Sequence, residues 1–221
     1  MCPVFGDVIR PIRNFYFTRY IYSLFLATLV SASEKWNKIF AQSNTKNIAA
    51  NDVLALYSYL LPDSGKALDL ACGLGGNALL LAQHGFETHA WDISSVAIDK
   101  LQATAQKMQL TISAETRNVE ENPPEANSFD VVVVGNFLHR PSFVKLIDAL
   151  CKKGLLFYQT FIEEKAEDTG PTNPNFLLKR NELLHLCNDM EILVYHEEGL
   201  QGDTNQGWRN YAMVVARKPD I

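Results

Sequence analysis

The most informative stretch of this chain is Ala67-Leu68-Asp69-Leu70-Ala71-Cys72-Gly73-Leu74-Gly75-Gly76-Asn77-Ala78. An apolar segment typical of a buried strand runs into a turn with three glycines, and an Ala- and Leu-rich segment with a helical pattern follows. Glycine lets the backbone turn tightly and lets a ligand approach atoms that a side chain would cover. The first N–H groups of a helix point back at such a turn and are free to bind the same ligand. The stretch therefore predicts a site for a nucleotide-type cofactor.

Strands and helices alternate along the rest of the chain. Apolar runs predict strands over residues 66–71, 87–91, 111–115, 129–135 and 154–160. Helical patterns precede, separate and follow these strands at residues 34–40, 49–61, 75–83, 94–108, 142–150 and 177–188. Such alternation builds βαβ units around a parallel sheet, whereas the last two strands, 191–197 and 209–217, indicate a hairpin. We expect one α/β, Rossmann-like domain with a seven-stranded, mostly parallel sheet, a C-terminal antiparallel hairpin and helices on both faces.

Composition and charge narrow the functions of such a domain. The 221 residues carry 47% hydrophobic and 20% charged side chains, which is normal for a soluble globular domain. The net charge of −5 disfavours a nucleic-acid surface, because phosphate binding needs clustered Lys and Arg. The four cysteines are far apart and have no metal-binding spacing. We therefore expect a small-molecule substrate, reduced structural thiols, no nucleic-acid partner and no metal.

Residues 1–33 have a composition of their own. Arg10, Arg13 and Arg19 precede an apolar run over residues 21–30, and small residues follow, which is the order found in secretory signal peptides. The run is shorter than the ~20 apolar residues that span a bilayer, so we expect no stable membrane insertion. A cleaved signal, a membrane-surface or packing helix, and an extension outside the working domain all fit this order. We favour the extension, followed by the working domain over residues 34–221.

The glycine turn by itself leaves two cofactor classes open. Residues 73–78 fit G-x-G-x-x-G/A, the fingerprint of nicotinamide and flavin dinucleotide sites. Asp69 ends the first strand, where its charge would repel a pyrophosphate but can bind an ammonium group or order water. Asp92 ends the second strand and is placed to accept hydrogen bonds from a ribose diol, which both cofactor classes contain. The terminal hairpin does not belong to an all-parallel dinucleotide sheet and so favours a different cofactor.

Four separated motifs in this order resemble one enzyme superfamily. The string from Asp69 to Ala78, then Trp91-Asp92-Ile93-Ser94, Asn118-Val119-Glu120 and the Val-rich strand from Phe129 are similar to the motif set of class I S-adenosylmethionine-dependent methyltransferases. The resemblance covers the chain from Trp36 to about Lys218. Within the superfamily, residues 136–141 and 170–178 resemble small bacterial tellurite-resistance methyltransferases.

This resemblance implies a cofactor, a reaction and a location. The cofactor would be S-adenosyl-L-methionine, the reaction methyl transfer to a small-molecule acceptor, and the location the cytoplasm, where this metabolite is found. A nicotinamide oxidoreductase with a Rossmann fold and a non-catalytic cofactor-binding protein of the same fold are the alternatives.

The resemblance also assigns roles at the cofactor site. Asp69, Gly73 and Gly75 would cradle the methionine and ribose portions. Asp92 would hold the ribose hydroxyls, with Ile93 beside the adenine.

Two positions depart from the family's pattern. Asn118 stands where many members have an acid that binds the adenine amino group, a bond that an amide oxygen can also accept. Ala71 replaces a glycine that is common in the family, a change that strand geometry would tolerate. The complete predicted cofactor-binding set is Asp69, Ala71, Cys72, Gly73, Gly75, Asn77, Asp92, Ile93, Asn118, Val119, Glu120 and Asn136.

Methyl transfer from a sulfonium is an in-line displacement, so the protein mainly aligns the reactants and excludes water. His139 follows the fourth strand and is the candidate catalytic base if the acceptor must lose a proton; otherwise it caps a helix or binds a backbone carbonyl. Tyr158, Gln159 and Thr160 end the fifth strand and would face the acceptor, unless Tyr158 belongs to the core. Arg140 would bind cofactor or an anionic acceptor, or form an ion pair. The polar loop over residues 163–175 would be a lid or a rigid connection.

Overall fold

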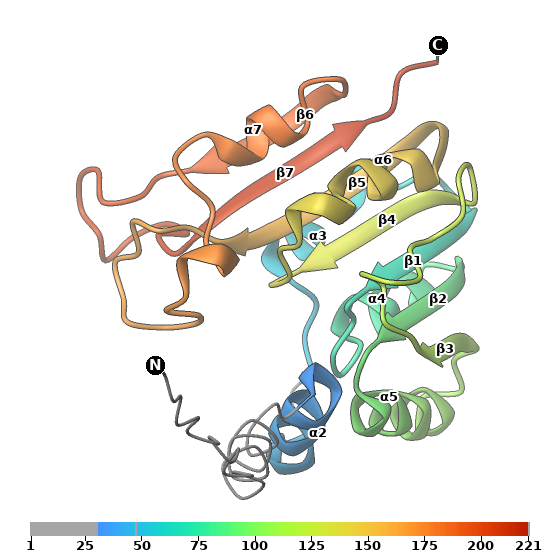
Figure 1. Ribbon diagram of the computed structural model, residues 1–221. Coiled ribbons are helices and arrows are strands. Elements are labelled where there is room, and N and C mark those ends of the chain that lie inside the picture. The colour runs from blue at the N-terminus through green and yellow to red at the C-terminus, as the bar shows by residue number, and fades with distance from the viewer. Residues whose placement is uncertain (1–30, 47, 221) are drawn as a thin grey trace, which may run out of the picture. The chain divides into compact units, whose positions relative to one another are not determined.

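The structure, a computed structural model, describes residues 31–46 and 48–220 (Figure 1). The predicted N-terminal extension lies, up to residue 30, outside the described residues. The first described helix is α2 (Ala32–Gln42), followed by α3 (Asp52–Tyr57) and the short 3-10 helix η1 (Ser58–Leu60). Within the described ranges, no helix is both long enough and apolar enough to cross a membrane.

A seven-stranded sheet organises the chain from residue 66 to residue 217 (Figure 1). Its strands lie in the order β3-β2-β1-β4-β5-β7-β6. β1 to β5 run parallel, and β7 pairs antiparallel with both β5 and β6. In chain order the bounds are β1 (Lys66–Leu70), β2 (Glu87–Asp92), β3 (Ile112–Thr116), β4 (Phe129–Gly135), β5 (Leu150–Phe161), β6 (Glu191–Glu197) and β7 (Tyr211–Arg217). The predicted parallel sheet with a C-terminal antiparallel hairpin is confirmed.

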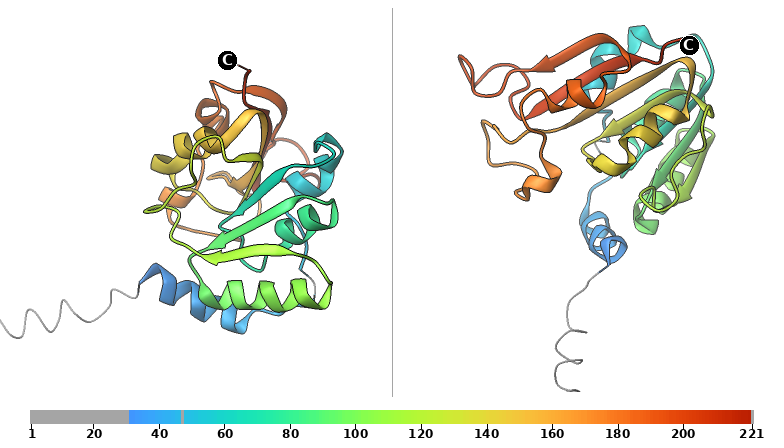
Figure 2. Two further views of the ribbon diagram at one scale, coloured as in Figure 1. Left: turned by 90° about the vertical axis from the view of Figure 1, so that its right-hand side faces the viewer. Right: turned by 45° about the horizontal axis from the view of Figure 1, so that its top comes forward.

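Helices cover both faces of this sheet, as predicted (Figure 2). The covering helices are α3, α4 (Gly76–Gln83) and α5 (Ser95–Lys107) on one face, and α6 (Phe143–Ala149) and α7 (Glu182–Leu186) on the other. Neighbouring residues of a central strand point to opposite faces, so Leu68 packs in the cluster under α6 and α7 and Ala67 in the cluster under α3. Residues 131–134 of β4 are completely buried, which explains why all four are valine.

Two predictions for the second half of the chain were wrong in detail. The helix expected over residues 177–188 is only the short α7, because the chain first forms the 3-10 helix η3 (Pro174–Phe176) and then pairs Leu178 with Ile162 in a parallel bridge. The strand expected from residue 154 begins at Leu150, and a register shift opposite Phe129 accommodates the extra residues. Backbone pairing thus ties the end of the 163–178 loop to the residue that follows β5.

Candidate active site

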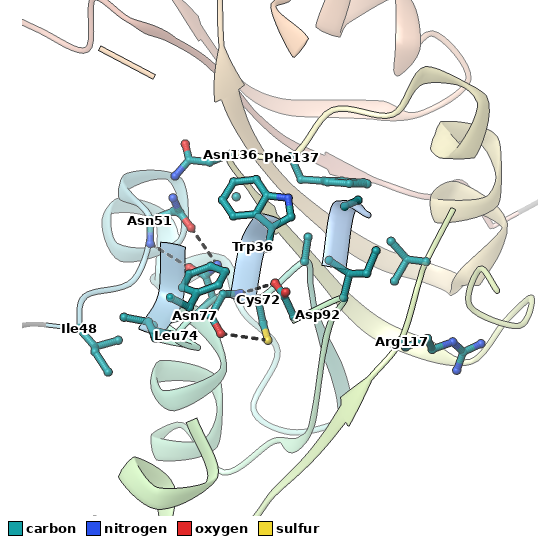
Figure 3. A pocket seen from close by; sticks show the side chains of 18 of the residues that line it. Trp36, Ile48, Asn51, Cys72, Leu74, Asn77, Asp92, Arg117, Asn136 and Phe137 are labelled. Carbon is teal, nitrogen blue, oxygen red and sulfur yellow. Dashed lines mark hydrogen bonds between the residues drawn. The ribbon is translucent and has the colours of Figure 1, made fainter. Parts of the chain in front are cut away.

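A cavity of about 460 Å³ opens at the carboxyl ends of β1, β2 and β4 (Figure 3). The strand order reverses between β1 and β4, and in doubly wound sheets ligands bind at this switch point. Ten residues of the predicted cofactor-binding set line the cavity: Ala71, Cys72, Gly73, Asn77, Asp92, Ile93, Asn118, Val119, Glu120 and Asn136. The structure therefore brings together motifs that lie up to about sixty residues apart in the chain.

Four predicted site residues do not line this cavity. Asp69 and Gly75 lie behind it, and neither His139 nor Tyr158 belongs to its wall. Sequence reasoning in turn missed lining residues from three places: the segment before α3, the glycine turn, and the ends of β3 and β4. These residues are Ala32, Trp36, Phe40, Ile48, Ala49, Asn51, Leu74, Arg117, Gly135 and Phe137. Gly76, from the predicted glycine turn, also lines the cavity.

The Asp92 carboxylate is fixed at the end of β2 by two backbone donors. Its Oδ2 accepts a hydrogen bond from the Gly73 N–H and its Oδ1 accepts one from the Ser94 N–H, both at 2.8 Å. Each oxygen keeps a free lone pair, so the carboxylate can still accept from two vicinal hydroxyls. Burial raises the pKa of Asp92, although the two backbone hydrogen bonds oppose this effect. The group is thus an oriented acceptor that the folded protein stabilises only in part.

The Asp69 carboxylate binds the protein itself. It is completely buried, and its oxygens accept hydrogen bonds from the Ala78 N–H at 3.0 Å and from the Asn77 side chain at 3.1 Å. Burial raises its pKa to about 7. The predicted contact of Asp69 with an ammonium group is therefore replaced by a structural role: Asp69 holds the first turn of α4 against β1.

An amide pair extends this anchoring to the segment before α3 (Figure 3). Asn77 Oδ1 accepts from the Asn51 N–H at 2.8 Å, and Asn77 Nδ2 donates to Asn51 Oδ1 at 2.9 Å. With a further bond from Nδ2 to Asp69, the Asn77 amide directs both of its N–H donors to the protein. Asn77 therefore lines the cavity mainly as a brace between the glycine turn and α3.

Two glycines of the turn, Gly75 and Gly76, are needed because other atoms of the protein pack against their backbone. A Cβ at Gly76 would lie 1.9 Å from the Ala49 carbonyl oxygen, and one at Gly75 would lie 2.3 Å from the Leu101 side chain. Gly73, whose φ is 51°, faces the cavity, where a Cβ would come within 3.2 Å of the Phe40 ring. The prediction that these glycines make room for a ligand therefore applies best to Gly73.

Ala71 and Cys72 lie between β1 and the glycine turn. Ala71 has a φ of 54°, so the expectation of strand geometry at this position was wrong. The left-handed conformation explains why a glycine suits this position, because a Cβ is strained there. Burial raises the pKa of the Cys72 thiol, which keeps it protonated and agrees with the reduced, structural thiols expected from the sequence.

The adenine end of the predicted site lies between β2 and the loop after β3. Ile93 and Val119 offer apolar surface there, and Asn118 turns the chain, since its Oδ1 accepts from the Glu120 N–H at 3.1 Å. Arg117 stacks over the Trp91 ring at 3.9 Å and donates to the Asn122 carbonyl. These bonds hold the loop in place beside the cavity.

His139 lies close to the cavity mouth. Its Nε2 is 3.8 Å from a carboxylate oxygen of Glu120, which does line the cavity, and its Nδ1 is 2.5 Å from the Ser142 hydroxyl. Both contacts fix the ring, and the contact with Glu120 connects it to the cavity wall. The role of His139 as a base thus stays a prediction. Of the two side chains, only the Glu120 carboxylate lines the cavity.

The end of β5 serves the fold. Tyr158 is fully buried, burial raises its pKa, and its hydroxyl donates to the Phe137 carbonyl at 2.6 Å. Gln159 accepts from the Val53 N–H at 2.9 Å and donates to Asp52, so it caps α3. The core alternative for Tyr158 fits these contacts, and the expectation that both side chains face an acceptor does not.

Arg140 holds the 163–178 loop. Its guanidinium donates to both Glu182 carboxylate oxygens, at 2.5 and 2.8 Å, and to the carbonyls of Asn175 and Leu177 at 2.8 Å. The pKa of Arg140 is raised and that of Glu182 lowered by this pairing. The ion-pair alternative for Arg140 therefore matches the structure, and the loop is a braced connection next to the site.

The side chains that line the cavity fit an adenosine-containing cofactor. The cavity wall holds a two-point acceptor for a ribose diol, Asp92, together with the apolar side chains of Ile93 and Val119. The Trp36 and Phe40 rings line the same cavity, and Trp36 is labelled in Figure 3. Aromatic faces suit a cationic centre such as a sulfonium. Across the described ranges, no group of three or more His, Cys, Asp or Glu residues is arranged to hold a metal ion.

Comparison with known proteins places this site in a family. The family described as "Methyltransferase domain" matches residues 67–154. The probable S-adenosyl-L-methionine-dependent methyltransferase TehB of Haemophilus influenzae is 31% identical over 173 residues, which cover 69% of this chain and 57% of TehB. The chain thus spans little more than half the length of this curated relative.

Solved structures share the fold. The crystal structure of TehB from Haemophilus influenzae matches with a TM-score of 0.61 at 24% identity, over 83% of this chain and 67% of that chain. The [4+2]-cyclase SpnF matches with a TM-score of 0.60 at 18% identity, over 76% of this chain and 80% of that one. The second match illustrates that the fold alone does not define a reaction. Family model, relative and site motifs agree: residues 67–154 belong to a methyltransferase domain, and the chain is similar to the S-adenosyl-L-methionine-dependent methyltransferase TehB.

Proposed function

We propose that this protein transfers a methyl group from S-adenosylmethionine to a small-molecule acceptor in the cytoplasm. The observation that carries the proposal is Asp92, whose two carboxylate oxygens are oriented by the Gly73 and Ser94 N–H groups at the wall of the cavity. The cofactor would supply an electrophilic methyl group on a sulfonium. Methyl transfer then needs alignment and exclusion of water, which the aromatic and aliphatic cavity wall supports.

The residues of the cavity divide this work. Asp92 would bind the ribose hydroxyls, and Ile93 and Val119 would enclose the adenine. Asn136, at the end of β4 with a φ of 57°, is exposed and would meet the acceptor. For an acceptor that loses a proton, the Glu120–His139 pair at the cavity mouth is the candidate proton acceptor.

The similarity to TehB suggests a tellurite-resistance-like branch, so oxyanions and thiols belong among the first acceptors to test. The net charge of −5 supports a small molecule over a nucleic acid. The cytoplasm is supported by the proposed cofactor, which is a cytosolic metabolite.

The test has two stages. Isothermal titration compares S-adenosylmethionine with NADH, and binding of NADH without the sulfonium compound would sink the proposal in favour of a nicotinamide oxidoreductase. Radiolabelled S-adenosylmethionine is then incubated with the full chain, a small-molecule cell extract and a panel of thiols, tellurite and halides. Label in a product with the wild type and not with Asp92→Ala supports methyl transfer. Binding without any transfer across the extract would favour a non-catalytic cofactor-binding protein.

A further inference from the structure

The cavity wall includes a segment that precedes the methyltransferase motifs. Residues 32–46 and 48–51, here called the strap, contribute Ala32, Trp36, Phe40, Ile48, Ala49 and Asn51 to the lining. Figures 1 and 2 show α2, the first part of the strap, lying beside α5. The strap is the only part of the wall, among the described residues, that does not follow a strand of the sheet.

Helix α2 has no buried residue, so apolar packing does little to hold it. Its least exposed positions, Ser33, Asn37 and Phe40, recur at helical spacing and form the face turned to the protein. Trp36 remains 40% exposed although its ring stacks on Phe40 at 5.7 Å. A helix with this face needs polar contacts to stay docked.

Those contacts come from α5. The Lys100 ammonium donates to the carbonyls of Phe40, Ala41 and Ser43, at 2.5, 3.2 and 2.9 Å. The last carbonyls of a helix have no partner within it, and a cation there also suits the helix dipole. At the other end of the contact, Asn37 Oδ1 accepts from the Ser94 hydroxyl at 2.6 Å and from the Val96 N–H at 3.3 Å. Lys100 thus uses all three of its donors to cap α2.

We propose that Lys100 is a positioning residue for the cofactor: by latching the C-terminal end of α2, it holds the Trp36 and Phe40 rings against the cavity and slows cofactor release. This inference rests on the proposed function for the identity of the ligand. The Phe40 ring reaches the Gly73 turn, so displacement of α2 opens the wall where the ligand contacts that turn. Lys100 itself does not line the cavity, and it acts only through the strap.

The proposal makes a linkage prediction. A ligand that contacts the docked strap stabilises it, and a mutation that lowers the docked population lowers apparent affinity by the same fraction. Lys100→Met keeps most of the side-chain volume and removes all three hydrogen bonds. We expect it to weaken S-adenosylmethionine binding about tenfold, mainly through faster dissociation.

Three measurements on the full-length chain test the latch. Hydrogen exchange without ligand compares residues 32–42 in the wild type and in Lys100→Met. Titration calorimetry with S-adenosylmethionine gives the affinity, and stopped-flow tryptophan fluorescence gives association and dissociation rates, with Trp36→Phe assigning the signal. Lys107→Met is the matched control, because Lys107 is an exposed lysine on the same helix. Asn37→Ala releases the second contact and should shift affinity and exchange in the same direction.

The outcomes separate the two proposals. Faster exchange confined to residues 32–42, together with faster dissociation and unchanged control, supports the latch. Unchanged exchange or an unchanged dissociation rate in Lys100→Met overturns it. If the wild type fails to bind S-adenosylmethionine, the proposed function fails, while hydrogen exchange still decides whether Lys100 holds α2. A Lys100→Met protein whose sheet amides also lose protection would show a general structural role and contradict the proposal.

Discussion

Replacing Asp92 by alanine separates what the carboxylate does for the ligand from what it does for the fold. In the structure each oxygen accepts one backbone N–H, from Gly73 or Ser94, and has one lone pair left for a ribose hydroxyl. A hydrogen bond to a charged group contributes about 1.5–3 kcal/mol, so two of them correspond to about 3–6 kcal/mol of binding. At about 1.4 kcal/mol per factor of ten, Asp92→Ala should weaken S-adenosylmethionine binding between about a hundredfold and about ten-thousandfold.

The effect on stability should be much smaller. Burial raises the pKa of Asp92 despite its two backbone hydrogen bonds, which means that the folded protein without ligand disfavours the charged carboxylate. Loss of the two N–H partners is therefore offset by removal of a poorly solvated charge. We expect the free energy of unfolding at pH 7 to change by no more than about 1–2 kcal/mol.

Calorimetric titration measures the affinity and urea unfolding measures the stability of the same preparations. Asp99→Ala, at an exposed position on α5, is the control and should leave both quantities near the wild-type values. An Asp92→Ala protein that folds and binds S-adenosylmethionine within threefold of the wild type would refute the assignment of Asp92 to the ribose. A stability loss as large as the affinity loss would refute the argument from its raised pKa.

Three further changes test the residues around the cavity. Ala71→Gly should raise the free energy of unfolding, measured in urea, by about 0.5–1 kcal/mol. The reason is that the strain of a left-handed alanine (φ 54°) exceeds the entropy that glycine adds to the unfolded chain. The control Ala103→Gly, at an exposed position inside α5, should instead lower the free energy of unfolding by about 1 kcal/mol. Burial raises the pKa of Asp69 from 3.8 to about 7. Between these pH values the folded state therefore binds more protons than the unfolded state. The free energy of unfolding should fall by up to about 1.4 kcal/mol per pH unit as pH rises from 5 to 7. Asp69→Asn should flatten that slope in urea titrations at pH 5, 6 and 7, and a wild-type slope no steeper than the variant's would contradict it. Arg140→Gln should speed proteolysis within residues 163–178 and leave the affinity for S-adenosylmethionine within about twofold of the wild type. The control Arg180→Gln, which breaks the exposed pair with Glu164, should change neither quantity. A large loss of affinity in Arg140→Gln would indicate that Arg140 binds the cofactor.

The sheet was predictable because local pattern and tertiary environment agree along it. Residues 131–134 are apolar in an unbroken run because both faces of β4 are covered, and the two last strands are close in sequence and paired. The segment from Leu177 to Asn188 was mispredicted because the apolar Leu178 forms an extended bridge with Ile162 instead of a helical turn. Arg140 and the bridge from Leu178 to Ile162 hold its first residues, which leaves room only for the five residues of α7.

The candidate site was predictable where a motif and a strand end coincide, as at Asp92. The strap was not predictable, because Trp36 and Phe40 belong to a mostly polar helix whose docking depends on Lys100, some sixty residues later. Aromatic residues at i and i+4 are a helix signal, but they do not indicate which surface the helix will meet.

The glycine turn shows why its motif fitted two classes of cofactor equally well. A glycine in such a motif reports that other atoms come close to the backbone, and it does not report which atoms these are. At Gly76 the approaching atom is the Ala49 carbonyl oxygen, and at Gly135 it is the Asn51 side chain. Two of the closest approaches around the cavity are therefore made by the strap, whose own sequence carries no motif. It follows that the ligand is better identified from Asp92, where two backbone donors orient a carboxylate at the cavity wall, than from the spacing of the glycines.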